Sequence, residues 1–143
     1  MKYGDITEDV QAQRNAYDCE LPLYDMLAED MSGLPSDVWD VVMCISTIEH
    51  VDADKHDDAL HEIYRVTRPG GLIFITSDYF RDLEQFEASP SRHLQFTAYT
   101  KEFVLNLPTK INVAFVGETD LDYCGDFIHS AYSFVNICLR KAL

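Results

Sequence analysis

The sequence contains little glycine, with 6 residues among 143. They stand at Gly4, Gly33, Gly70, Gly71, Gly117 and Gly125 and cannot be combined into a G-x-G-x-x-G pattern. Such a loop lets a nucleotide approach the backbone closely, because glycine has no side chain in the way. The sequence therefore lacks a glycine-rich cofactor loop of the usual kind.

Basic residues are scarce as well. The 11 lysines and arginines stand against 25 aspartates and glutamates, which gives a formal charge of −14 and an isoelectric point near 4.5. A surface of this kind repels phosphate backbones and anionic lipid headgroups. We therefore expect neither a nucleic-acid partner nor a membrane partner.

The 4 cysteines have no close spacing. Without a C-x-x-C pair the sequence offers no zinc or redox motif, so we expect free thiols. No apolar run approaches the roughly 18 residues of a membrane span, and residues 1–5 lack the apolar segment of a secretion signal. We expect a cytoplasmic protein with one compact domain over residues 1–143, since 47% of the residues are hydrophobic.

The clearest structural signal is a strand, a helix and a second strand. Val38–Ile45 is an almost continuous apolar run rich in β-branched residues, which predicts a strand buried on both faces of a parallel sheet. Lys55–Thr67 has apolar residues at helical spacing, with Asp54 as its expected N-cap. Arg68–Gly71 then ends the helix, and Leu72–Thr76 is a second buried strand. Together they predict a right-handed βαβ unit.

The flanking segments carry weaker patterns. Residues 1–6 have a weak strand pattern, and residues 79–96 are polar and irregular, as is typical of a loop or lid. The other expected elements are a helix over Thr7–Tyr17, a strand over Leu21–Ala28, a helix over Lys101–Leu107 between Thr100 and Pro108, and strands over Ile111–Val116 and Ala131–Leu139. We expect the last two strands to pair antiparallel.

Several segments resemble class I S-adenosylmethionine-dependent methyltransferases of the type 11 kind. The most specific are Asp40–Val51, with its Glu-His-Val loop, and Glu62–Ile75, with its Pro-Gly-Gly turn. Ala28–Pro35 is similar to the family's segment before its fourth strand, and Tyr132–Lys141 is similar to its last strand. The resemblance implies a Rossmann-like α/β fold with an open, mostly parallel sheet and a C-terminal antiparallel strand pair.

The chain departs from this family at its start. The family's first strand ends in a glycine-rich loop that has no match here, so we expect an N-terminally truncated fold without the first strand and helix. That strand lies in the middle of the family's sheet, and its loss would leave unpaired strand edges, which are costly. Three explanations stay open: a rearranged sheet, a homodimer or partner chain that completes the sheet, or a fragment of a longer protein.

The resemblance implies S-adenosylmethionine as the cofactor. Asp5 would bind its ribose hydroxyls, because a carboxylate at a strand end offers two acceptor oxygens. Asp30 would accept a hydrogen bond from the adenine amino group beside the apolar Met31. Ile45 and Ser46 would turn their backbone toward the cofactor at the carboxyl end of a strand. Asp5 as an exposed terminal acid and Ser46 as a strand-ending hydroxyl are the alternative interpretations.

Glu49 and His50 follow on the loop above that site. His50 is the best candidate for a general base, since an imidazole titrates near neutral pH, and a structural role of the loop is the alternative. Ser46 stands where some relatives have an acidic metal ligand, so we expect no metal. His56 and His61 fall on the expected helix and are interpreted as surface residues.

The resemblance predicts methyl transfer from S-adenosylmethionine to a small-molecule acceptor. A sulfonium already carries an activated methyl group, so the protein mainly has to align donor and acceptor and exclude water. The missing glycine-rich loop favours an alternative. In that alternative the chain is a non-catalytic, methyltransferase-like partner subunit or remnant that does not bind the cofactor alone.

Overall fold

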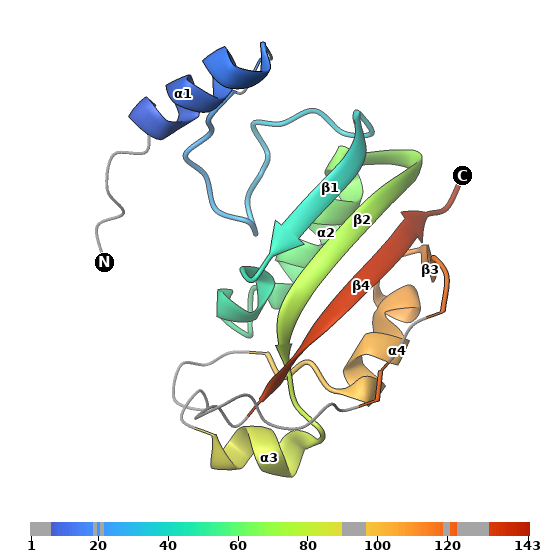
Figure 1. The fold of residues 1–143 in the computed structure, drawn as a ribbon. Coiled ribbons are helices and arrows are strands. Elements are labelled where there is room, and N and C mark those ends of the chain that lie inside the picture. Colours follow the sequence, from blue (N-terminus) through green and yellow to red (C-terminus); the bar gives the residue numbers. More distant parts are fainter. Residues whose placement is uncertain (1–6, 19, 21, 90–96, 119–120, 123–131) are drawn as a thin grey trace.

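The computed structural model describes residues 7–18, 20, 22–89, 97–118, 121–122 and 132–143. Its centre is a four-stranded sheet in the order β1-β2-β4-β3 (Figure 1). The strands are β1 (Trp39–Ile45), β2 (Thr67–Tyr79), β3 (Val113–Phe115) and β4 (Ser133–Lys141). β1 and β2 are parallel, whereas β4 is antiparallel to both of its neighbours. The expected parallel pair and the expected C-terminal antiparallel pair are both confirmed.

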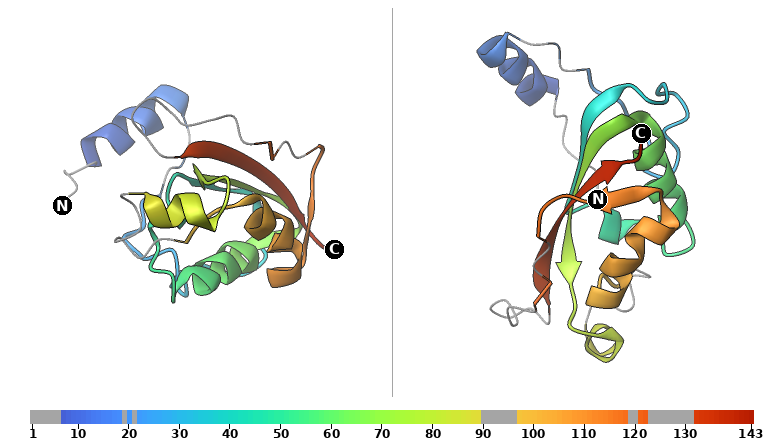
Figure 2. Two further views of the ribbon diagram at one scale, coloured as in Figure 1. Left: turned by 90° about the horizontal axis from the view of Figure 1, so that it is seen from below. Right: turned by 90° about the vertical axis from the view of Figure 1, so that its right-hand side faces the viewer.

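Two helices lie against the same face of this sheet (Figure 2). They are α2, which connects β1 to β2, and α4, which precedes β3. The helical segments are α1 (Thr7–Tyr17), the 3-10 helix η1 (Ile48–His50), α2 (His56–Val66), α3 (Leu83–Ala88) and α4 (Lys101–Lys110). α2 begins after Lys55 instead of the expected cap Asp54. α4 begins at the expected cap, because the Thr100 hydroxyl oxygen accepts a hydrogen bond from the Phe103 N–H at 3.3 Å.

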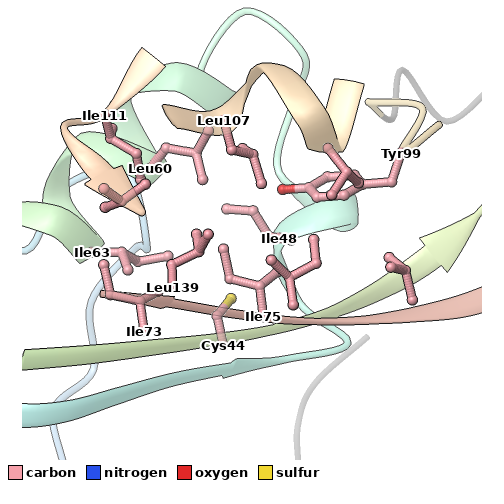
Figure 3. Packing of buried hydrophobic residues seen from close by; sticks show 14 of the residues in the cluster. Cys44, Ile48, Leu60, Ile63, Ile73, Ile75, Tyr99, Leu107, Ile111 and Leu139 are labelled. Atoms are coloured by element: carbon pink, nitrogen blue, oxygen red, sulfur yellow. The ribbon is translucent and has the colours of Figure 1, made fainter. Parts of the chain in front are cut away.

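The hydrophobic core lies between that sheet face and the two helices (Figure 3). β2 contributes Ile73 and Ile75, which are both fully buried, because alternate residues of a strand point to the same face. β4 contributes Ile137 and Leu139 in the same way. These side chains pack against the apolar stripes of the helices, which include Ala59, Leu60, Ile63, Val104 and Leu107. Each such burial stabilises the fold by ~1.5–3 kcal/mol.

The opposite face of the sheet is open at β1 and β4. Val41, Met43 and Ile45 of β1 are 45%, 64% and 50% exposed, and Phe134 of β4 is 46% exposed. The prediction that the first strand is buried on both faces is therefore wrong, because α2 and α4 both cover the other face. Within the described sheet β1 is also an edge strand, with β2 as its neighbour on one side.

Other expectations fail outside the core. No strand forms over the described residues 22–28, where the backbone makes turns and an isolated bridge joins Leu27 to Asp30. α3 lies inside the region expected to be a loop. α4 continues past Pro108, because Ile111 N–H can still donate to Leu107 O at 3.0 Å at the end of the helix. The expected strand over residues 1–6 lies outside the described residues.

The Pro-Gly-Gly sequence lies inside the first part of β2, which begins at Thr67 directly after α2 and not at the expected Leu72. The pairing of β2 with β1 is irregular over this stretch. Gly70 has a φ of 75°, a conformation that is costly for residues with a side chain. A Cβ atom on Gly71 would lie 2.8 Å from the carbonyl oxygen of Arg68 and 3.0 Å from that of Asp40. A side chain at either glycine would therefore cause strain in this irregular stretch of β2.

We expect Ile75→Ala to lower the free energy of unfolding by ~2–5 kcal/mol, because it removes a fully buried side chain and leaves a cavity. Ile45→Ala in the neighbouring strand is the matched control, since Ile45 is 50% exposed. It should cost less than about 1 kcal/mol. Urea unfolding followed by circular dichroism measures both, and equal losses would contradict the one-sided core.

Candidate functional site

Ser46 marks the point where β1 ends and the candidate site begins. Its φ is 45°, which is unusual for a residue with a side chain and is typical of functional turns. The Ser46 N–H donates to the side-chain oxygen of Thr76 at 2.9 Å and to its carbonyl oxygen at 3.1 Å. The Thr47 hydroxyl donates to Ile45 O at 2.8 Å. These contacts hold the loop after β1 against the carboxyl-terminal half of β2.

Glu49 and His50 are adjacent in sequence, but Glu49 is buried and His50 is exposed to solvent. Glu49 is only 2% exposed, and its Oε2 atom has no hydrogen-bond partner among the described residues. His50 is exposed. A buried carboxylate oxygen without a partner is energetically costly and is concentrated at functional sites. The Glu49 side chain is therefore a buried acid whose Oε2 atom has an unused acceptor capacity among the described residues.

Asp78 on β2 is a further candidate site residue that was not among those predicted from the sequence. Burial raises the pKa of the Asp78 carboxyl to about 6, and the negative charge of Glu49 adds to the effect, whereas His50 opposes it. Asp78 therefore lies within electrostatic reach of both residues of the pair. A signal was present in the sequence, since Asp78 follows the apolar run of β2 at its carboxyl end.

The neighbouring thiol of Cys44 is buried. Burial, together with the charge of Glu49, raises the pKa of Cys44 to about 11, which keeps the thiol protonated at neutral pH. Cys44 and Cys138 are free cysteines, as expected. No group of three or more metal-binding side chains occurs within the part of the chain that the structure describes.

The Asp30–Met31 segment lies before β1 and is held on α2. The Asp30 carboxylate is exposed, and hydrogen bonds from Ser32 keep its pKa below the ordinary value. Met31 is half-buried against the core. Its N–H donates to Glu62 Oε2 at 2.7 Å, and its carbonyl oxygen accepts from Arg65 at 2.7 Å.

Two apolar grooves lie along β1. One, of about 360 Å³, is lined by Pro22, Tyr24, Met31, Leu34, Trp39, Val41, Val42, Met43 and Val66. The other, of about 180 Å³, is lined by Met43, Ile45, Phe74, Ile75, Thr76, Asn136, Ile137 and Cys138. Met31 and Ile45 therefore lie in adjoining grooves that share Met43. A flat apolar ring with a hydrogen-bonding edge suits such a surface beside a carboxylate.

The structure thus forms two clusters from the predicted site residues. Ser46, Glu49 and His50 gather at the carboxyl ends of β1 and β2, whereas Asp30 and Met31 lie together on the segment beside α2. Asp5 lies outside the described residues.

The interpretation of His56 as a surface residue is wrong, whereas His61 is exposed. His56 is 2% exposed, and its Nε2 lies 3.1 Å from the hydroxyl of Tyr99. Its ring packs edge-on against Tyr99 and Phe103. Helical position alone could not reveal this burial, because the covering residues Tyr99 and Phe103 are distant in sequence.

Burial lowers the pKa of His56 to about 4, from an unfolded value near 6.5. The unfolded chain therefore binds the extra proton between these two values, and folding stability falls as the pH decreases through this window. Between pH 7.5 and pH 5 we expect His56 to cost roughly 2 kcal/mol of stability. Urea unfolding of His56→Phe should lack this part of the acid sensitivity. His61→Gln should retain it, and identical pH profiles of both variants would contradict the assignment.

The open α/β sheet, with α2 connecting the parallel strands β1 and β2, is Rossmann-like. Residues 5–75 match the methyltransferase domain family. The chain is 29% identical over 104 residues to the tRNA N(3)-methylcytidine methyltransferase trm140 of Schizosaccharomyces pombe, which covers 69% of this chain and 34% of that protein. The chain therefore spans about a third of the length of this curated relative.

Solved structures share the fold. A SAM-dependent methyltransferase from Methanosarcina mazei is 10% identical with a TM-score of 0.61, over 96% of this chain and 79% of that chain. The geranyl diphosphate C-methyltransferase of Streptomyces coelicolor, in complex with S-adenosyl-L-homocysteine, is 10% identical with a TM-score of 0.63, over 92% of this chain and 59% of that chain. The domain match over residues 5–75 and the shared fold support a class I S-adenosylmethionine-dependent methyltransferase.

The curated relative corrects one expectation from composition. The prediction of a small-molecule acceptor, with nucleic acids excluded, is wrong, because the chain is similar to a tRNA methyltransferase. Net charge describes the whole surface, whereas binding depends on the local potential at the site and on further segments of the protein.

Among the described residues, no helix is long and apolar enough to span a membrane.

Proposed function

We propose that the protein transfers the methyl group of S-adenosylmethionine to a nucleobase of RNA. The match of residues 5–75 to the methyltransferase domain supports the donor, and the similarity to the tRNA methyltransferase supports the acceptor class. The observation that carries the proposal is the cluster of Ser46, Glu49, His50 and Asp78 at the carboxyl ends of the two parallel strands. This is where an open α/β sheet binds its ligands.

The residues beside β1 fit the adenine end of the cofactor. Asp30 remains ionised and exposed, so its oxygens can accept from an exocyclic amino group, and Met31 and Ile45 line apolar grooves. When bound, S-adenosylmethionine supplies a methyl group that is already activated by the sulfonium.

The acidic cluster suits an acceptor that carries N–H groups. Glu49 Oε2 is buried without a partner among the described residues, so a donor from the acceptor would satisfy it. Asp78 is largely ionised above pH 7 because its pKa is about 6. It can accept a hydrogen bond from an amino group or take the proton that a methylated nitrogen releases. His50 is exposed beside them and would contact the acceptor from the solvent side.

A second candidate function is favoured by the open side of the sheet. Val41, Met43 and Ile45 expose an apolar face next to the edge of β1, and the sequence has no glycine-rich loop. A methyltransferase-like subunit that does not bind the cofactor alone would have these properties. Cofactor binding by the isolated chain distinguishes the two candidates.

Isothermal titration calorimetry should detect S-adenosylmethionine binding with a micromolar Kd. We expect Asp30→Ala to weaken it about tenfold or more, because the variant removes a hydrogen bond to a charged group. Asp58→Ala is the control, since it removes an exposed carboxylate of the same charge from α2. Absence of binding by the folded wild-type chain would exclude the enzyme and favour the second candidate.

Transfer of a tritiated methyl group from S-adenosylmethionine to bulk tRNA should rise with pH through about 6, since Asp78 must lose its proton to act as an acceptor. Asp78→Asn should abolish this limb of the kcat/KM profile and lower the plateau about 10²-fold or more. Asp54→Asn, on the exposed loop before α2, should leave the profile unchanged. An unaltered profile in Asp78→Asn would remove Asp78 from the mechanism, and absence of label in tRNA despite cofactor binding would exclude this acceptor.

A further inference from the structure

The segment before β1 has few backbone hydrogen bonds of its own. Asp30 N–H donates to Leu27 O at 3.1 Å, and Leu34 N–H donates to Met31 O at 2.8 Å. The segment belongs to no helix or strand, so its conformation depends on side chains that reach it from elsewhere. Those side chains come from α2.

Arg65 is the main contact. Its Nη2 donates to the carbonyl oxygen of Met31 at 2.7 Å, and its Nη1 donates to the carbonyl oxygen of Leu34 at 2.8 Å and to the Ser36 hydroxyl at 2.9 Å. One planar guanidinium thus binds three acceptors across residues 31–36. A lysine has a single nitrogen and could not hold the same three groups in this geometry.

Glu62 fixes the guanidinium and contacts the same segment. Arg65 donates to it twice, from Nε to Oε1 at 2.6 Å and from Nη2 to Oε2 at 2.9 Å. Glu62 Oε2 also accepts from the Met31 N–H at 2.7 Å. The N–H and the C=O of Met31 are therefore both bound by the pair, which fixes the orientation of this residue.

The sequence of α2 produces this arrangement. Leu60 and Ile63 turn into the core, and the spacing of three residues places Glu62 and Arg65 side by side on another face of the helix. The hydrogen bond from Arg65 is the largest influence that holds the pKa of Glu62 below its ordinary value, whereas the charge of Asp30 acts in the opposite direction. Arg65 therefore also offsets the repulsion between the two carboxylates.

We infer that Arg65 is a positioning residue for the cofactor, which acts by holding Met31 and the adjacent Asp30 in their binding orientation. The inference rests on the proposed function. Arg65 and Glu62 are partly exposed, at 29% and 18%, so their pair adds little to global stability, and its main effect is on the geometry of the segment.

Arg65→Gln and Arg65→Lys test the inference through hydrogen exchange without cofactor and through calorimetry with S-adenosylmethionine. In both variants we expect the amides of Met31 and Leu34 to exchange about tenfold faster and the cofactor to bind about tenfold more weakly. The KM for S-adenosylmethionine should rise, whereas kcat at saturating cofactor should stay within about twofold. Arg68→Gln is the control, because it removes the same charge from an exposed pair with Asp40 on the adjacent strand.

The outcomes are distinct. Full affinity in Arg65→Lys would show that charge alone matters and would overturn the positioning role. Unchanged affinity in Arg65→Gln, with a wild-type chain that binds the cofactor, would overturn the inference and leave the proposed function intact. A loss of affinity that follows a loss of global stability in urea unfolding would reduce Arg65 to a structural residue. No binding by the wild-type chain would overturn the proposed function and the inference with it.

Discussion

The packing of one sheet face against α2 and α4 is the interaction on which the other features of this protein depend. Buried aliphatic residues of β2 and β4 meet the apolar stripes of the two helices in one continuous core. This core fixes the orientation of α2 about its own axis. Because Leu60 and Ile63 must point inward, Glu62 and Arg65 necessarily face the segment before β1.

The same core determines where the chemistry can occur. β1 and β2 run parallel, so the residues that follow them lie together at the carboxyl ends of these strands. Ser46 turns there in a left-handed conformation, and the following helical turn buries Glu49 while His50 stays exposed. The site therefore combines a strained backbone, a buried carboxylate and a second acid, Asp78, within one loop and one strand end.

Much of this was predictable from local patterns. The apolar runs of β1 and β2, the helical spacing of α2 and the cap at Thr100 each depend on neighbours in sequence, and all appear in the structure. The burial of His56 was not predictable, because it depends on Tyr99 and Phe103 from a distant segment. The exposure of Val41, Met43 and Ile45 was missed for the same reason, since an apolar run does not reveal how many layers will cover a strand.

The sequence by itself determined the β1-α2-β2 unit, the resemblance to class I methyltransferases and the Glu49–His50 pair, because each depends on residue types at short spacing. The tertiary structure alone decided that Asp78 joins this pair, that the sheet is covered on one face, and that Arg65 binds the segment that carries Asp30. These features bring together residues about 30 positions apart in the chain. Only the pairing of strands and the packing of helices on them create such contacts.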